Sequence, residues 1–366
     1  MKIAILGAGA MGRTVIGHLQ ECVDPSSLIA YDVDRQSLET TQKQYPIRCT
    51  ESLDSILEDR QVGLVFVTAS NGAHKELSIA AMRAGKAVMC EKPMANTLQD
   101  AIEMVEEAEK NGVYFQIGFE LRYSKLFTTV KKWIDAGKLG EVRNIQCTYI
   151  CSEYWGKKAW RTKRAYGGSM FGEKLCHYID LPRWWTGSDL TEIYAMASPN
   201  VVPYYEVLDN YHASFKFSSG AVTHLTFMMP FASTAETDPL RNVLDQQKDD
   251  GHELRYLVMG TRGGAETDVF HRRIKRWEYR ETENGFHCDL VETLTWPAEE
   301  DHVHFHNTKD QSHDIVRRVH DGLPPYISAR DSLETMKACA AVDLSIDLNR
   351  AVQVGETMGL PVPDSR

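Results

Sequence analysis

The chain has 366 residues, 43% of them hydrophobic and 25% charged, which is an ordinary composition for a soluble globular protein large enough for two domains. Its formal net charge of −10 argues against a nucleic acid or an anionic membrane as the main partner, and we find no run of about 18 apolar residues that would span a bilayer. Eight cysteines without a CxxC pair indicate free thiols in a reducing compartment, so we expect a cytoplasmic protein.

The N-terminus predicts a buried strand, a glycine turn and the start of a helix. The apolar run Ile3–Leu6 leads into a Gly-x-Gly-x-x-Gly segment, and apolar residues at helical spacing follow from Val15. Such glycines permit a tight turn, a close approach of the backbone to a dinucleotide pyrophosphate, and close packing of the helix on the strand. The free N–H groups at the helix start then bind the anion. The residues expected at the pyrophosphate are Gly7, Gly9, Ala10, Met11 and Gly12.

The second predicted strand, Leu28–Tyr31, ends at Asp32, and this position predicts a preference for NAD. Asp32 lies about twenty residues beyond Gly12, where a carboxylate accepts hydrogen bonds from the adenosine ribose and repels the additional phosphate of NADP. Arg35 nearby weakens this preference slightly. The alternative is an ordinary strand–turn–helix unit with a solvent-facing aspartate.

Strands and helices alternate through residue 118, which predicts a doubly wound parallel sheet with its ligands at the carboxyl ends of the strands. From Val142 onward, the predicted strands alternate polar and apolar residues. We therefore expect an α/β protein with a Rossmann domain over residues 1–121 and an α+β domain over 122–366. We expect the second domain to have an open, largely antiparallel sheet, and its C-terminal helices would be able to pack against the Rossmann domain. The polar stretch 231–253 predicts a long loop that would suit a lid.

Two later segments carry residues suited to acid–base chemistry. Lys92 follows the predicted strand Ala87–Cys90, where its ammonium would polarise a substrate oxygen or shuttle its proton. Glu173 and His177 are spaced i, i+4 on a predicted helix, so the carboxylate would orient the imidazole as a general base, and Asp180 follows three residues later. Taken alone, each segment also has a plain structural explanation, a solvated lysine in a loop and an ion pair on a helix surface.

Together these segments resemble the glucose–fructose oxidoreductase, inositol dehydrogenase and MocA family (Gfo/Idh/MocA) along essentially the whole chain. The glycine loop with Asp32 is similar to the NAD fingerprint of that family. Glu91-Lys92-Pro93 is similar to its EKP motif, and residues 167–180 are similar to its GGxxxxDxGxHxxD segment. The departures are Glu173 in place of the usual aspartate, Leu175 in place of the glycine, an additional charge at Lys174, and Glu120 where the family often carries Asn or Gln.

The resemblance implies that Lys92 and His177 flank the reacting carbon, with Asp180 nearby. It also implies a second sheet that covers the nicotinamide and mediates contacts in a homodimer or homotetramer. The further cofactor residues are Thr68, Ala69, Ser70, Asn71, His74 and Glu91. The candidate substrate residues are Glu120, Arg122, Tyr123, Trp160, Arg161, Arg164, Lys174 and His313.

A segment rich in basic and aromatic residues, 155–166, precedes the glycine pair. Aromatic faces suit sugar rings and basic groups suit a carboxylate, sulfonate or phosphate, although a solvated surface loop would have the same composition. Farther along, His302, His304 and His306 alternate as they would on one face of a strand, a spacing compatible with zinc. The resemblance implies no metal, and we expect none.

We therefore expect an NAD-dependent oxidoreductase that acts on a secondary hydroxyl of a small carbohydrate, namely a sugar, polyol or sugar acid. His177, or Lys92, would take the hydroxyl proton, and Lys92 would stabilise the developing alkoxide. One alternative on the same fold is a glycoside hydrolase that recycles its NAD through oxidation, elimination and reduction. The other is a non-catalytic, NAD-bound sensor.

Overall fold

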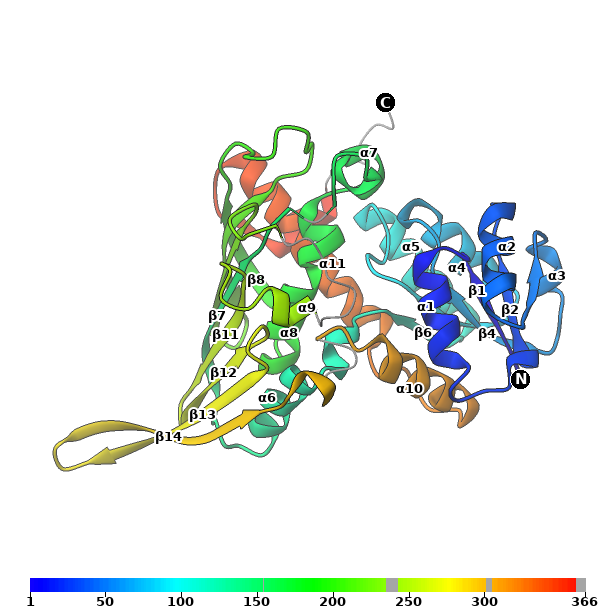
Figure 1. Ribbon diagram of the computed structural model, residues 1–366. Coiled ribbons are helices and arrows are strands. Elements are labelled where there is room, and N and C mark those ends of the chain that lie inside the picture. Colours follow the sequence, from blue (N-terminus) through cyan, green and yellow to red (C-terminus); the bar gives the residue numbers. More distant parts are fainter. Residues whose placement is uncertain (154, 235–242, 301–304, 360–366) are drawn as a thin grey trace. The chain divides into compact units, whose positions relative to one another are not determined.

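The computed structural model describes residues 1–153, 155–234, 243–300 and 305–359, and the chain divides into two compact units (Figure 1). The first unit comprises Met1–Glu120 and Asn307–Met336, and the second comprises Leu121–His306 and Lys337–Arg366. All eight cysteines are free.

The first unit is built on a parallel sheet of six strands in the order β3-β2-β1-β4-β5-β6, which confirms the predicted doubly wound sheet. The order reverses between β1 and β4, and this reversal is where doubly wound proteins bind their ligands. The strands are β1 (Lys2–Leu6), β2 (Leu28–Tyr31), β3 (Arg48–Thr50), β4 (Val62–Val67), β5 (Ala87–Cys90) and β6 (Phe115–Ile117).

Helices of the first unit have clear local signals. The longest helix before residue 120 is capped by the Thr97 hydroxyl, which accepts the amide N–H of Asp100, and it ends at Gly112 in the left-handed conformation. Residues 307–336 return to this unit, where α10 packs against α1. The helices are α1 (Ala10–Leu19), α2 (Arg35–Gln44), α3 (Asp54–Leu57), α4 (His74–Arg83), α5 (Leu98–Asn111) and α10 (Thr308–His320). A further helix, α11 (Ala329–Leu348), carries the chain from the first unit into the second.

The second unit is built on a nine-stranded sheet in the order β14-β13-β12-β11-β7-β10-β9-β8-β15. Only the β7–β10 pair is parallel among the described strands of this sheet, which confirms the predicted open, largely antiparallel sheet. The strands are β7 (Val142–Ile150), β8 (Leu190–Met196), β9 (Asn210–Phe217), β10 (Val222–Met228), β11 (Glu253–Gly260), β12 (Gly263–Asp268), β13 (Arg273–Thr282), β14 (Gly285–Thr295) and β15 (Val352–Gln353).

One face of this sheet is covered by helices (Figure 1). The strands alternate, so that Ile145, Cys147 and Tyr149 of β7 are buried, and Tyr256 of β11 packs edge-on against Trp185. The helices of the unit are α6 (Lys125–Asp135), α7 (Arg164–Gly167), α8 (Cys176–Thr186) and α9 (Val243–Gln246). The short α9 lies within the stretch predicted as a loop, and residues 235–242 of that stretch lie outside the described residues.

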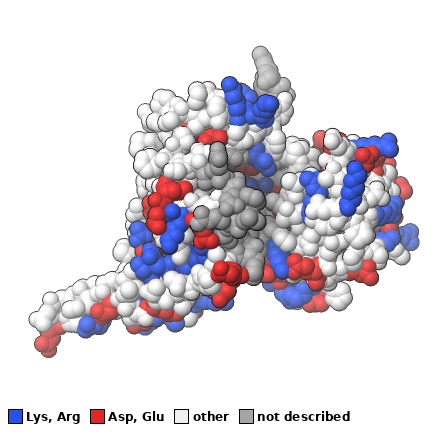
Figure 2. All heavy atoms as spheres, viewed as in Figure 1, with Lys and Arg blue, Asp and Glu red and all other residues white. Residues whose placement is uncertain are grey.

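At its edge the sheet narrows to a ribbon of β13 and β14 that extends beyond the neighbouring strands (Figure 1). Basic and acidic side chains are interspersed over the visible face of each unit (Figure 2). No helix in the described parts of the chain is long and apolar enough to cross a membrane.

Candidate active site

The glycine loop contains two glycines that the fold itself requires and one that it does not. Gly7 has a φ of 110°, and a side chain there would meet the backbone N of Ala69 at 2.5 Å. A Cβ at Gly12 would collide with the carbonyl oxygen of Gly7. A Cβ at Gly9 would meet nothing within 4 Å. The space at Gly9 is therefore open toward a ligand, as the approach of a pyrophosphate to the backbone requires.

Asp32 lies at the carboxyl end of β2 and is fixed by backbone hydrogen bonds. Its carboxylate accepts the N–H of Ala8 at 2.7 Å and that of Asp34 at 2.9 Å. These bonds hold the acidic group beside the glycine loop, where it suits a ribose and disfavours a second phosphate. Arg35 is exposed and donates through Nε to Glu39 at 3.3 Å within its own helix.

The turn after β4 is tied to the glycine loop and to the turn after β5. Thr68 donates its hydroxyl to the carbonyl of Gly7 at 2.7 Å. The buried His74 has Nδ1 at 2.8 Å from the carbonyl of Pro93 and Nε2 at 3.2 Å from that of Ala69. Through these bonds His74 and Thr68 support the loops predicted to line the cofactor. Asn71 is buried at the start of the same turn, which follows Ser70.

The ionisable side chains of the candidate site in the first unit are those of Glu91, Lys92 and Glu120. Glu91 is buried, and its burial, together with the carboxylate of Glu120, raises its pKa above the ordinary range, while the ammonium of Lys92 opposes this shift. The Lys92–Pro93 peptide bond is cis. Gly118 makes room for Glu91, since a Cβ there would lie 3.0 Å from its Oε2. The first unit thus keeps a partly neutral carboxyl group next to the predicted catalytic lysine.

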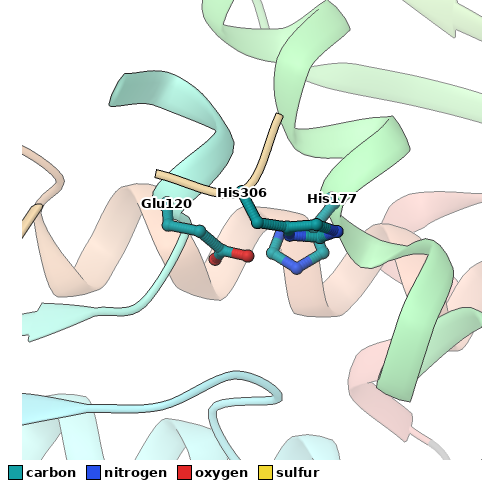
Figure 3. A group of neighbouring side chains, drawn as sticks. All are labelled: Glu120, His177 and His306. Atoms are coloured by element: carbon teal, nitrogen blue, oxygen red, sulfur yellow. The ribbon is translucent and has the colours of Figure 1, made fainter. Parts of the chain in front are cut away.

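In the second unit, the segment that carries His177 begins with a π-helical turn, Phe171–Leu175, and continues as α8. The sequence predicted a helix here but not the π-turn, a feature that occurs frequently at functional sites. His177 is buried, and its imidazole lies 5.8 Å from that of His306 between ring centroids, with an interplanar angle of 71° (Figure 3). Figure 3 also draws Glu120, which ends the first unit.

Glu173 is engaged by an arginine from the preceding loop. Its carboxylate, 4% exposed, accepts Nε of Arg161 at 2.7 Å. The sequence interpretation gave Glu173 the role of orienting His177, and that role stays a prediction.

Asp180 forms a buried bidentate pair with Arg122. Nε and a terminal nitrogen of Arg122 each donate to one carboxylate oxygen of Asp180 at 2.7 Å, and the side chains are 5% and 1% exposed. Arg122 lies in the turn Glu120–Tyr123, which leads into α6. This pair links α8 to the start of the second unit, and it was not foreseen in the sequence, where the two residues are 58 positions apart.

A second device supports the same helix. Pro182 lies inside α8 and has no N–H for the carbonyl of Tyr178, one turn earlier. The hydroxyl of Tyr256, from β11, donates to this carbonyl at 3.0 Å instead. A proline inside a predicted helix is the signal that could have pointed to such a donor.

The remaining predicted residues have separate surroundings. The guanidinium of Arg161 lies over the ring of Trp160, 4.4 Å from its centroid, and Arg164 donates through Nε to the carbonyl of Glu206. His313 of α10 has Nε2 at 2.7 Å from the carbonyl of His18 in α1, so packing within the first unit accounts for its position. His302 and His304, which the sequence predicts to alternate with His306 on one face of a strand, lie outside the described residues.

The geometry defines an α/β protein with a dinucleotide-binding loop and an imidazole-bearing helix in a second unit. The profile described as "Oxidoreductase family, NAD-binding Rossmann fold" matches residues 1–119, and the GFO/IDH/MocA C-terminal domain matches residues 127–266. The chain belongs to the Gfo/Idh/MocA family, and the NAD-binding domain that this family carries fits the open glycine loop and Asp32.

Named relatives agree with this assignment. The chain is 30% identical to inositol 2-dehydrogenase from Salmonella typhimurium over 193 residues, which are 52% of this chain and 55% of the relative, so the match spans about half of that enzyme. It is 24% identical to myo-inositol 2-dehydrogenase from Thermotoga maritima, over 98% of this chain and all of the relative. Levoglucosan dehydrogenase in complex with NADH and levoglucosan has the same fold, with a TM-score of 0.78 at 18% identity, covering 97% of this chain and 99% of that chain.

Proposed function

We propose that this protein oxidises a secondary hydroxyl group of a small carbohydrate with NAD as the hydride acceptor. The observation that carries the proposal is the combination of a glycine loop open at Gly9 with Lys92 and His177 at the matching positions of two family motifs. NAD supplies the acceptor for the hydride, and the chain supplies binding, orientation and proton transfer.

In the proposed reaction the C–H and O–H bonds of one carbinol break and a ketone forms. NAD, held by the glycine loop and Asp32, would accept the hydride, and the hydroxyl proton passes to His177 or Lys92 and then to solvent. Lys92 stabilises the negative charge that develops on the substrate oxygen. Glu91 beside it holds a proton more firmly than an ordinary glutamate, because burial and Glu120 raise its pKa, so it adds little opposing negative charge near neutral pH.

A second candidate function is a glycoside hydrolase that oxidises its substrate transiently, eliminates the aglycone and reduces the sugar again. The departures of segment 167–180 from the family pattern support the hydrolase as an alternative. Glu173, in place of the family's aspartate, is bound to Arg161, and Lys174 adds a charge. A transient ketone would acidify the neighbouring C–H, and His177 would then remove that proton.

The test uses the purified protein with NAD, free sugars, polyols, sugar acids and aryl glycosides. A continuous rise of NADH absorbance with one free carbohydrate supports the dehydrogenase. Release of an aglycone without lasting NADH supports the hydrolase. NAD binding without either signal contradicts both and favours a sensor. A homodimer or homotetramer in the cytoplasm remains a prediction.

A further inference from the structure

Arg161 uses only part of its hydrogen-bonding capacity within the protein. Its Nε donates a hydrogen bond to the carboxylate of Glu173, and among the described residues this is the only hydrogen bond of the Arg161 side chain. Its side chain is 42% exposed, whereas that of Glu173 is 4% exposed. A guanidinium carries five N–H donors in one plane, so the donors of the terminal nitrogens remain for a ligand.

The plane of this guanidinium is held from two directions. Glu173 fixes one edge, and the ring of Trp160 lies against one face, with the guanidinium carbon 4.4 Å from the ring centroid. A side chain fixed in this way loses little conformational entropy when it binds a ligand. The outer edge of Arg161 is therefore preorganised for a planar anion that accepts two parallel hydrogen bonds, and a carboxylate has that geometry.

Two neighbouring basic residues, Lys163 and Arg164, share one acidic residue as their partner. Lys163 donates to Glu206 at 2.9 Å, and Arg164 donates to the carbonyl of the same residue. The segment 153–174 carries six basic and two acidic residues, a balance of +4 in a chain of net charge −10. Figure 2 shows a group of basic side chains over the place where Figure 1 labels α7. With Glu206 included, the balance of these residues falls from +4 to +3, which still favours anions.

Arg161 is also connected to the residue proposed as the base. Glu173, which holds Arg161, lies in the π-helical turn one helical turn before His177, and both side chains are buried. The two residues are four positions apart in the sequence, across the junction between the π-helical turn and α8.

We infer that Arg161 is a carboxylate-binding residue of the substrate site, and that the substrate is a sugar acid, such as a hexuronate or a glycoside of one. This inference rests on the proposed function, since it assigns the substrate class of the same site. A neutral polyol would leave the outer edge of Arg161 without its partner.

The experiment compares matched substrates that differ only at one carbon, D-galacturonate against D-galactose and D-glucuronate against D-glucose, each with NAD. We expect kcat/KM for at least one acid to exceed that for its neutral partner by about 10- to 100-fold, the range of a charge-assisted bidentate contact. Arg161→Gln should remove this preference through a higher KM for the acid. Arg161→Lys, which keeps the ion pair with Glu173, should retain part of it. Lys163→Gln, paired on the same segment, is the control and should keep the preference.

A parallel titration separates this inference from the proposed function. Calorimetry of NADH-loaded protein measures binding of the two acids without turnover. If the protein binds an acid, Arg161→Gln weakens this binding, and no NAD is reduced in the turnover assay, the inference is supported and the dehydrogenase is contradicted. Equal turnover of acid and neutral partner overturns the inference and leaves the dehydrogenase standing. An acid preference that survives in Arg161→Gln also overturns it, as does the absence of both binding and turnover with the acids.

Discussion

Replacing Asp180 with asparagine tests how the helix that carries His177 is held. Asp180→Asn keeps the shape of the side chain but removes the buried carboxylate charge that faces the guanidinium of Arg122, which is 5% exposed. Loss of one partner of a buried ion pair costs about 3–5 kcal/mol, and the remaining amide oxygen retains one acceptor, so we expect about 3 kcal/mol. With a urea dependence of about 2–3 kcal/mol/M, the midpoint should fall by about 1–1.5 M.

The chain provides a selective probe for this measurement. All seven tryptophans lie between residues 121 and 306, so tryptophan fluorescence reports the second unit. Asp289→Asn is the matched control, because Asp289 pairs with Arg280 in the same unit and the two side chains are 49% and 58% exposed, so its loss should cost less than about 1 kcal/mol. Equal midpoints for the two variants would refute the argument. A normal midpoint for Asp180→Asn together with lost turnover would instead assign Asp180 a direct part in the chemistry.

Three further predictions concern the first unit. Gly9→Ala should change the free energy of unfolding, measured by circular dichroism, by less than about 0.5 kcal/mol and should weaken NAD binding. Gly12→Ala should lower both the free energy of unfolding and the affinity for NAD, because its Cβ meets the backbone. Equal stability losses in the two variants would contradict this. Asp32→Ser should raise the ratio of NADP to NAD affinity about 10-fold or more in a fluorescence titration, and an unchanged ratio would remove Asp32 from the ribose site. The raised pKa of Glu91 means that the folded state binds its proton more tightly than the unfolded state. The contribution of Glu91 to the free energy of unfolding is therefore fully present below the ordinary pKa of a glutamate, and it is lost as the pH rises toward the raised pKa of the folded state. Glu91→Gln should reduce the loss of stability between about pH 5 and about pH 8, and identical pH dependence in the variant would contradict the shift.

The sequence predicted the first unit well because its signals are local. Apolar runs such as Val62–Val67 are buried on both faces, and glycine turns and caps mark where helices begin and end. The strands between residues 253 and 295 escaped prediction for a physical reason. Strand β14 is largely exposed on both faces, so it carries no amphipathic alternation. Strand β12 buries Glu266 and Asp268, which are neutralised by arginines of neighbouring strands.

The candidate site was predictable in its residue types but not in its pairings. Spacing on one helix placed Glu173 and His177 a turn apart, and family motifs indicated Lys92 and Asp180. The partner of Asp180 comes from a distant turn, and long-range pairs of this kind depend on tertiary packing that no local pattern records.

The most direct test of the proposed dehydrogenase activity is the change in NADH absorbance when purified protein, NAD and the carbohydrate panel are mixed. We expect a sustained rise with a free sugar, polyol or sugar acid, and loss of that rise in both Lys92→Ala and His177→Ala while NAD binding persists. Bound NAD with no rise on any carbohydrate, or turnover that survives both substitutions, would contradict it.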